Sequence, residues 1–596
     1  MMMIEQELEI ELLEATKSLY GVEIDAKLIQ LQKTRKEFEG DFTLVVFPLL
    51  RSSKKSPEKT AEEIGDYMQQ KSDMLDKYNV VKGFLNLRLK QLVWTDFLDR
   101  VMDQEKFGFQ IPGSSGKVMI EFSSPNTNKP LHLGHLRNNF IGDSISRIYE
   151  ANGKEVIRTQ IINDRGIHIC KSMLAWKKFG NNENPQNTAL KGDKLVGKYY
   201  VRFDQEHKKQ IAELIEGGME EEAATKNTSI LKEAQEMLVK WENGDQEVRA
   251  LWEEMNSWVY EGFDQTYDSI GVFFDKLYFE SNTYIVGREK VLEHENHPSF
   301  YRMNDGSVWI DLKEEKLDAK LLLRSDGTSV YMTQDIGTAI LREEEYHCDS
   351  YYYVVGNEQD YHFKVLALIL KKMGFEWAND LTHLSYGMVD LPSGKMKSRE
   401  GTVVDADDLV ADMEQTAAKI SQSHGKIEAL DDKEQEELYH MIGLGALKYF
   451  ILKVDPKKRM LFDPEESVDF NGNTAPFIQY THARIRSILR KSNYESAVPM
   501  DQASISLAEE DRDLVRMLFD FPEVIKEAGK QKSPALIANF TYEFVKTFNH
   551  FYQNTPPIVK EEAIEMKNFR LNLCAKSAEL IRNSMSLLGI DVPERM

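Results

Sequence analysis

Residues 118–147 read V-M-I-E-F-S-S-P-N-T-N-K-P-L-H-L-G-H-L-R-N-N-F-I-G-D-S-I-S-R, and the rest of the chain is organised around them. The apolar run at 118–122 predicts a buried strand, and the prolines and asparagines after it predict a turn. From Leu136 onward, apolar residues recur at helical spacing until the stop signal at 152–153. A second apolar run at 156–162 predicts another strand. The stretch therefore predicts a β–loop–α–β unit.

Two histidines and a glycine, His132, His135 and Gly134, lie where the loop ends and the helix is expected to begin. A helix N-terminus presents unpaired N–H groups and the positive end of its dipole, and both suit phosphate oxygens. Imidazoles donate hydrogen bonds as charge builds on a reacting phosphate, and a glycine lets a base or ribose lie against the backbone. We expect a nucleotide site here; two surface histidines beside a turn are the alternative interpretation.

The composition indicates a multidomain protein of the cytoplasm. The chain has 596 residues, of which 41% are hydrophobic and 29% charged, and its net charge of −23 argues against non-specific nucleic-acid binding by the whole surface. A local basic face remains possible. The three cysteines are far apart and form no C-x-x-C, which argues against a zinc ribbon or a disulfide framework and fits a reducing compartment. No apolar run approaches the roughly 20 residues of a membrane span, and the acidic start is not a secretory signal.

The segments before and after the central stretch differ in pattern. Residues 1–112 predict a small α+β module with helices at 4–18 and 60–71 and strands at 42–50 and 80–89. We expect Asn86 and Arg88 on the solvent face of the last strand, available to RNA, with an ordinary polar face as the alternative. From 426 to 596 strand signals vanish and amphipathic helices predict a second, helical core.

Between these segments an α/β pattern continues, interrupted by a hydrophilic helical insertion at 181–265. Asp164 follows the second strand, where ligands collect in open α/β sheets, and either touches substrate or caps a helix. Short strands are expected at 321–323 and 330–333. The loop 391–404, L-P-S-G-K-M-K-S-R-E-G-T-V-V, carries cations that suit a departing pyrophosphate, although a basic loop is often only solvated surface.

Taken together, these features resemble the class I aminoacyl-tRNA synthetases and, within them, the arginyl-tRNA synthetase family. H-L-G-H at 132–135 is similar to the HIGH signature, and K-M-K-S-R at 395–399 is similar to the KMSKS loop. E-F-S-S-P-N-x-x-K-P-x-H-x-G-H-L-R resembles the eukaryote-like branch of the family. The resemblance covers nearly the whole chain.

The resemblance implies an α/β fold class with a Rossmann-like doubly wound parallel sheet in a catalytic domain at 113–425. It also implies an additional N-terminal α+β domain at 1–112 that contacts the tRNA elbow (D-loop). A C-terminal helical, DALR-like anticodon-binding domain is implied at 426–596.

The resemblance also implies a role for individual residues. The catalytic set is His132, His135, Lys129, Lys395 and Lys397. Arginine would be bound by Glu121 and Asp335, because a guanidinium demands planar carboxylate partners. Tyr331 would pack beside the guanidinium, Gln359 would lie near the same pocket, and Asn126 would hold the α-amino group. ATP would be bound by His132, Gly134, His135, Lys129, Lys395 and Met396. The tRNA would be contacted by Asn86, Phe477, Tyr480, Arg484 and Met596.

One position departs from the family pattern. The fourth KMSKS residue, usually a lysine, is Ser398 here. Lys129 matches a lysine that the eukaryote-like branch carries upstream of HIGH, so we expect Lys129 to supply the missing phosphate charge, with Lys395 and Lys397 secondary.

The implied reaction is ATP-dependent ligation of L-arginine to tRNA(Arg) through an arginyl-adenylate. ATP acts as a substrate with Mg²⁺, and no protein-held metal or zinc is expected. The implied protein is a cytoplasmic monomer without a membrane partner. Three alternatives stay open: another class I synthetase, a different HIGH-bearing nucleotidyltransferase, and a non-catalytic, synthetase-like tRNA-binding protein. The tRNA bases read, the role of the insertion and any need for tRNA during activation are also open.

Overall fold

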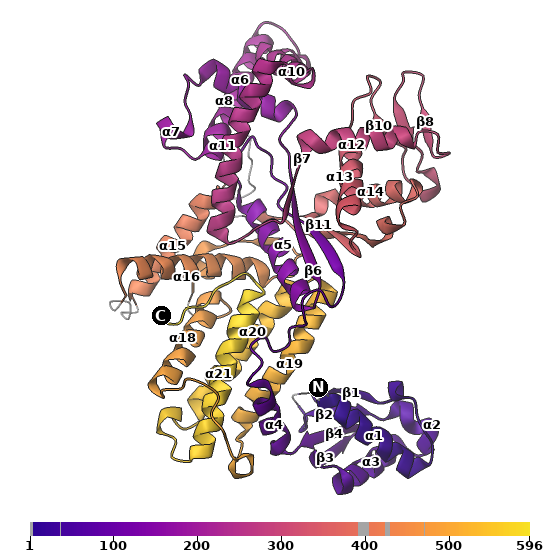
Figure 1. Cartoon of the computed structure of the whole chain (residues 1–596), viewed down its shortest axis with the longest axis vertical. Coiled ribbons are helices and arrows are strands. Elements are labelled where there is room, and N and C mark those ends of the chain that lie inside the picture. Colours follow the sequence, from indigo (N-terminus) through magenta and orange to yellow (C-terminus); the bar gives the residue numbers. More distant parts are fainter. Residues whose placement is uncertain (1–3, 36, 391–403, 424–429, 470) are drawn as a thin grey trace. The chain divides into compact units, whose positions relative to one another are not determined.

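The computed structural model describes residues 4–35, 37–390, 404–423, 430–469 and 471–596 (Figure 1). The chain forms two compact units, each assembled from segments that are distant in sequence. The first comprises Met1–Phe107, Ile485–Asp520 and Lys546–Leu580, and the second comprises Gly108–Arg484, Phe521–Val545 and Ile581–Met596.

The first unit contains a four-stranded antiparallel sheet in the order β1-β2-β4-β3. Its strands are β1 (Gln30–Lys33), β2 (Phe42–Val45), β3 (Leu75–Val81) and β4 (Phe84–Leu89), and its N-terminal helices are α1 (Ile4–Tyr20), α2 (Leu50–Ser53), α3 (Pro57–Lys71) and α4 (Gln91–Val101). The expected α+β module is confirmed. The single strand expected at 80–89 is wrong: Lys82 and Gly83 adopt φ of 51° and 79°, and this two-residue turn makes a hairpin of β3 and β4.

The second unit is built on a five-stranded parallel sheet in the order β12-β11-β5-β6-β7. Its strands are β5 (Lys117–Glu121), β6 (Glu155–Ile162), β7 (Lys276–Phe279), β11 (Ser350–Gly356) and β12 (Leu381–Tyr386). This is the expected Rossmann-like doubly wound order. Strands β5 and β11 are neighbours from which the chain winds outward in opposite directions, and ligands bind at the carboxyl ends of strands at such a switch point.

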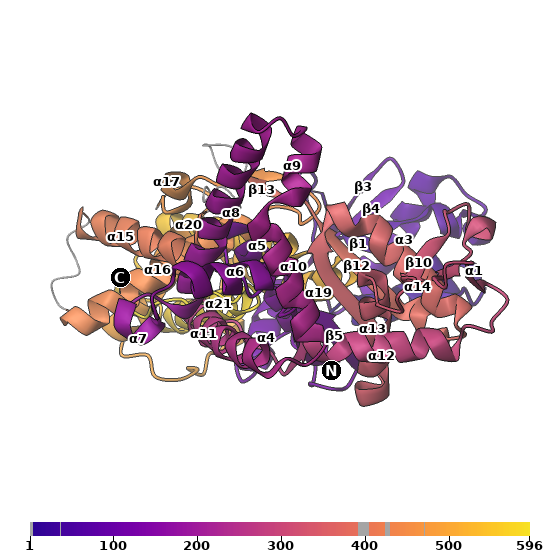
Figure 2. The same ribbon diagram turned by 90° about the horizontal axis from the view of Figure 1, so that it is seen from above.

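Helices and a small second sheet connect these strands. Between β6 and β7 lie α6 (Ile167–Phe179), α7 (Pro185–Thr188), α8 (Gly192–Glu216), α9 (Glu221–Asn227), α10 (Ser229–Glu242) and α11 (Gln246–Ile270). Helices α6, α8, α10 and α11 pack together, which confirms the helical insertion (Figures 1 and 2). Between β7 and β11 lie α12 (Glu280–Glu293), β8 (Phe300–Arg302), β9 (Val308–Ile310), β10 (Lys320–Leu323) and α13 (Tyr331–Tyr346).

The strand expected at 330–333 is wrong because α13 begins there. Val330 is extended and serves as the N-cap, and the backbone N–H of Thr333 donates to its carbonyl at 3.0 Å. The Thr333 hydroxyl also donates to the carbonyl of Leu322, so tertiary bonding fixes the helix start despite a β-branched sequence.

The remaining elements are mostly helical, as the sequence predicts. They are α14 (Asp360–Lys372), β13 (Val389–Asp390), α15 (Ala406–Ser423), α16 (Asp432–Leu452), β14 (Met460–Leu461), α17 (Pro464–Ser467), α18 (Ala475–Lys491), α19 (Glu509–Gln531), α20 (Pro534–Asn554) and α21 (Ile564–Ser586). Among the described residues, none of these helices combines the length and apolar character that crossing a bilayer requires.

Candidate active site

The turn after β5 is tied to the neighbouring strand of the sheet. Ser123 and Ser124 adopt left-handed φ angles of 77° and 48°, which are rare for residues other than glycine. The Ser123 N–H donates to Asn138 Oδ1 at 2.5 Å, and Asn138 Nδ2 donates to the carbonyl of Val354 on β11 at 2.7 Å. Backbone strain of this kind persists where the surroundings over-determine it, and such places cluster at functional sites.

The HIGH-like residues form the N-terminal cap of α5 (Leu133–Ala151). His132 is the N-cap residue, and its Nδ1 accepts a hydrogen bond from the Gly134 N–H at 3.1 Å. His135 Nδ1 accepts in turn from the His132 N–H at 3.1 Å. Because both Nδ1 atoms accept, the neutral rings carry their protons on Nε2. Gly134 has no room for a side chain, since a Cβ would lie 2.9 Å from His132 Cε1.

Both imidazoles are neutral at physiological pH. Burial, with a further contribution from the positive charge of Lys129, lowers the pKa of His132 to about 3. Burial and the charges of His132 and Lys129 hold the pKa of His135 well below its usual value. The pair therefore offers two Nε2–H donors rather than two cations, beside a lysine that supplies positive charge. Lys129 and His132 line a cavity of about 250 Å³.

The role expected for Glu121, offering its carboxylate to a substrate guanidinium, stays a prediction. Glu121 forms an ion pair with Arg342 of α13, and the two side chains are only 8% and 1% exposed. Burial raises the pKa of Glu121, and the adjacent guanidinium opposes that rise. Although burial alone would lower the pKa of Arg342, the Glu121 carboxylate raises it. The Arg342 guanidinium also lies 4.7 Å from the centre of the Tyr278 ring, so Glu121 already has an internal partner.

Asp335 is a partly accessible acid. Its Oδ2 lies 2.5 Å from His362 Nε2, and its side chain is 37% exposed. Glu280, the first residue of α12, lies close enough that Asp335 contributes to its electrostatics. Burial raises the pKa of Glu280 to about 7, while Arg165 opposes the shift. A buried carboxylate of this kind is a candidate ligand for a guanidinium.

Sequence reasoning missed Glu280, although a signal was present. It directly follows β7, and polar residues at the carboxyl end of a parallel strand are candidates for ligand binding. Asp164 caps a helix, but this helix is α12 and not the next one along the chain, α6, whose N-cap is Gly166. Its carboxylate accepts from the Ser281 N–H at 2.8 Å, from Ser281 Oγ at 2.7 Å and from Tyr260 at 3.1 Å, so it fixes the start of α12 beside Glu280.

The remaining arginine candidates are exposed. Tyr331 is 73% exposed and opens α13, one helical turn before Asp335. Asn126 lies in the loop after β5, and Gln359 lies in the loop after β11. All three therefore belong to loops or helix starts at the carboxyl edge of the sheet, where the acids also lie. The loop residues Lys395, Met396, Lys397 and Ser398 fall outside the described residues.

The candidate tRNA residues of the helical segment share one helix. Phe477, Tyr480 and Arg484 lie on α18 at spacings of three and four, so they share a face. The Arg484 guanidinium lies 4.9 Å from the Tyr480 ring, and the Phe477 ring lies 5.8 Å from that of Tyr542. All three are half-buried, as is Met596.

Asn86 does not face solvent, contrary to expectation. It is 1% exposed; its Oδ1 accepts from Thr43 Oγ1 at 2.7 Å and its Nδ2 donates to Asn79 at 2.8 Å. Cross-strand polar pairing of this kind satisfies a buried amide. The sequence does not reveal this face, because the hairpin turn at 82–83 sets the register of β4.

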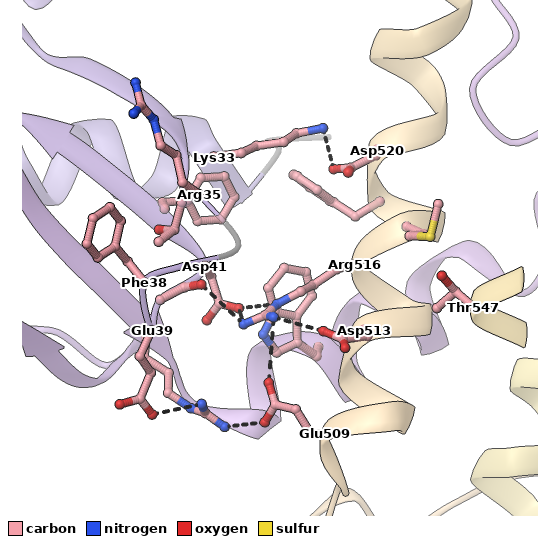
Figure 3. A pocket seen from close by; sticks show the side chains of 17 residues that line it. Lys33, Arg35, Phe38, Glu39, Asp41, Glu509, Asp513, Arg516, Asp520 and Thr547 are labelled. Carbon is pink, nitrogen blue, oxygen red and sulfur yellow. Dashed lines mark hydrogen bonds and ion pairs between the residues drawn. The ribbon is translucent and has the colours of Figure 1, made fainter. Parts of the chain in front are cut away.

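A cavity of about 530 Å³ lies beside this sheet in the first unit (Figure 3). Its charged groups are largely paired with each other: Lys33 with Asp520 at 2.7 Å, Arg88 with Glu509 at 2.7 Å, and Arg516 with Asp41. The Phe38 ring stands at the rim and is 40% exposed. Within the described residues, no group of three or more His, Cys, Asp or Glu side chains is arranged to hold a metal ion.

Comparison with known proteins matches all parts of the chain. Residues 99–463 match the family described as tRNA synthetases class I (R), catalytic domain. Residues 478–596 match the DALR anticodon binding domain, and residues 6–89 match the arginyl tRNA synthetase N terminal domain. Solved structures share the fold: an arginyl-tRNA synthetase from Thermus thermophilus has a TM-score of 0.78 at 24% identity, with both chains covered completely.

Curated relatives are similar over the full length. An arginine–tRNA ligase of Bacteroides thetaiotaomicron is 55% identical over 598 residues, and one of Parabacteroides distasonis is 54% identical over 598 residues, each with both chains covered completely. Because these relatives are bacterial, the expected placement in a eukaryote-like branch is wrong. The motif that suggested that branch, with its lysine before HIGH, is therefore no mark of it in this chain. The chain belongs to the arginyl-tRNA synthetases, a family of class I.

Proposed function

We propose that this chain ligates L-arginine to tRNA(Arg) with ATP, through an enzyme-bound arginyl-adenylate. The observation that carries the proposal is the pair of neutral imidazoles at the N-terminus of α5, each with its proton on Nε2. These donors lie at the switch point of a doubly wound sheet, whose carboxyl edge also carries two neighbouring acids, Glu280 and Asp335. That combination suits a nucleotide triphosphate and a cationic amino acid.

In the first step, a carboxylate oxygen of arginine attacks the α-phosphorus of ATP. The bond from that phosphorus to the bridging oxygen breaks, and pyrophosphate leaves with the electron pair. His132 and His135 donate Nε2–H hydrogen bonds to oxygens whose charge grows in this transition state. Lys129 adds positive charge beside them and replaces the family's lysine at the position of Ser398. Lys395, Met396 and Lys397 contribute to binding the same phosphates.

In the second step, a hydroxyl of the tRNA's terminal ribose attacks the carbonyl carbon of the adenylate. The mixed-anhydride bond breaks and AMP leaves, so the protein needs no nucleophile of its own. Positioning and charge stabilisation supply the rate enhancement. We propose Mg²⁺ as the partner of ATP, held by its phosphates.

For the substrate guanidinium, we propose Asp335 and Glu280 as the two carboxylates. Tyr331 packs beside the guanidinium, Gln359 lines the same pocket, and Asn126 holds the α-amino group. Glu121 acts indirectly, through its ion pair with Arg342. A site with two carboxylates rejects neutral isosteres, because these would leave buried charge unpaired.

For the tRNA, we propose that residues 1–112 contact the elbow and residues 426–596 contact the anticodon arm, with 113–425 catalytic. Phe477, Tyr480 and Arg484 offer aromatic and cationic surface to unstacked bases, with Met596 nearby in the same role. Asn86 contributes by shaping the sheet rather than by direct contact. We propose a monomer that works in the cytoplasm.

A charging panel tests this function. Purified protein is incubated with ATP, Mg²⁺, total tRNA and each of the twenty amino acids, and labelled aminoacyl-tRNA is measured. Arginine alone should be charged. Charging of another amino acid would overturn the pocket, and tRNA binding without any charging would favour a non-catalytic protein. In a separate assay of labelled adenylate formation, Lys129→Ala should slow the reaction far more than Lys397→Ala; equal small losses would refute the role of Lys129.

A further inference from the structure

We propose that two lysines of the insertion, Lys191 and Lys194, are positioning residues for adenylate formation, because they hold the segment 404–408 that braces His132. The inference rests on the proposed function and gives the insertion a part in it. Each contact that supports the inference lies within the second unit.

The first link is a backbone pairing around the HIGH-like residues. The Leu133 N–H donates to the Val404 carbonyl at 3.2 Å, and the Ala406 N–H donates to the Leu131 carbonyl at 3.0 Å. Between them His132 and Asp405 form an antiparallel bridge. His132 is thus held on its backbone by a segment more than 270 residues later in the chain, in addition to its cap of α5.

The second link is the grip on that segment by the start of α8 (Gly192–Glu216). Lys194 Nζ lies 3.3 Å from Asp405 Oδ1 and 2.7 Å from Asp408 Oδ1. Lys191 Nζ lies 2.7 Å from Asp407 Oδ2 and 3.4 Å from Asp193. The insertion therefore contacts three acidic residues, Asp405, Asp407 and Asp408, around the start of α15.

Except at Asp408, whose side chain is 69% exposed, these ion pairs are partly buried. The side chains of Lys191 and Asp405 are each 14% exposed, and that of Asp193 is fully buried. Asp405 also caps α15, because its Oδ1 accepts from the Asp407 N–H at 2.9 Å. Four carboxylates meet here, so removing either lysine leaves like charges close together in a partly buried place, where repulsion is weakly screened.

The third link connects the position of His132 to the rate of adenylate formation. A donor to the α-phosphate acts only when it lies within hydrogen-bond reach of the developing charge. A displacement of about 1 Å at a reacting group costs on the order of 10²-fold in rate. Loss of the bracing at 404–408 should therefore lower the rate of adenylate formation. The KM for arginine should not change, since Asp335 and Glu280 lie on other elements.

The test compares Lys191→Met and Lys194→Met with a matched control, Lys178→Met. Lys178 lies on α6 and forms an ion pair with Glu233 of α10 at 2.6 Å, within the same helical bundle and away from 404–408. Single-turnover formation of labelled adenylate is measured at varied ATP and arginine, in the presence of tRNA, alongside melting temperature.

The expected result is a fall of about tenfold or more in the single-turnover rate for Lys191→Met and Lys194→Met, with KM for arginine within about twofold of wild type. Lys178→Met should match wild type, and Lys194→Arg should recover most of the rate because it keeps the charge. A raised KM for ATP at an unchanged rate would overturn the proposal by making Lys194 an ATP ligand. Losses equal to those of the control, or losses that only follow melting temperature, would also overturn it. A wild-type protein that forms no arginyl-adenylate would instead refute the proposed function.

Discussion

Glu121→Gln separates a structural carboxylate from a substrate-binding one. In the structure, the Glu121 carboxylate faces Arg342, and both side chains are almost completely buried. Replacing the carboxylate by an amide keeps the shape and removes the charge. Arg342 would then remain as a buried cation without its counter-charge, which is costly because burial disfavours the charged form.

The magnitude follows from the burial of the pair. Breaking a buried ion pair by removing one partner costs about 3–5 kcal/mol, whereas replacing both partners by apolar residues of similar volume is often neutral. At about 2 °C per kcal/mol for a domain of this size, Glu121→Gln should lower the melting temperature of the catalytic unit by about 6–10 °C. The double variant Glu121→Leu/Arg342→Met should recover most of that loss.

The assay combines thermal melting with arginine kinetics. Glu121→Gln should melt early. The KM for arginine, at a temperature where the variant is folded, should change by less than about tenfold, because Asp335 and Glu280 are the substrate contacts that we propose. The reasoning would be refuted by an unchanged melting temperature together with a KM for arginine raised about a hundredfold. That result would return Glu121 to direct contact with the guanidinium.

Three further outcomes follow from the site and its surroundings. Burial raises the pKa of Glu280, which lies beside Arg165, Asp164 and Asp335, to about 7, so its carboxylate ionises between pH 6 and 8. The KM for arginine should therefore fall about tenfold over that pH range, and Glu280→Gln should flatten this pH profile. His132→Asn keeps an acceptor for the Gly134 N–H but loses the Nε2–H donor, so single-turnover adenylate formation should slow about 10²–10³-fold with little change in melting temperature. Burial lowers the pKa of Lys448 from 10.5 to about 8, so the unfolded chain binds more protons than the folded chain between those pH values. The free energy of unfolding of the wild type, measured in urea, should therefore rise by about 3 kcal/mol relative to that of Lys448→Met between pH 8 and 10.5.

Local sequence was enough to predict the HIGH-like unit. The apolar run at 118–122, the turn residues and the helical spacing from Leu136 all act over a few residues, so the strand, turn and helix follow from nearby chemistry. The same holds for the helical segment after 426. Only the start of α5 differs from the prediction: the helix begins at Leu133 and not at Leu136. His132 and His135 form a reciprocal cap that the residue types alone do not predict.

Partners distant in sequence were not predictable. Glu121 and Arg342 are more than 200 residues apart, and nothing in either segment reveals that one neutralises the other. The prediction that Asn86 faces solvent failed for a related reason, since a one-residue change of register exchanges the two faces of a strand. Glu280 was recoverable from its place after a strand, but only once β7 was known to belong to the parallel sheet. Charge pairing and sheet membership are tertiary facts.

The helix that begins at His132 is also packed against the end of the chain. Ser144 Oγ on α5 donates to the Leu587 carbonyl at 2.8 Å, and Lys448 lies buried beside the same region. The tail then continues to α18, where His482 Nδ1 lies 2.9 Å from the Pro593 carbonyl. The C-terminal segment thus contacts both α5, which carries His132 and His135 at its start, and α18, which carries the candidate tRNA residues. A substitution that loosens the tail disturbs both helices at once, which is why the charge of Lys448 is best measured by unfolding and not by charging activity.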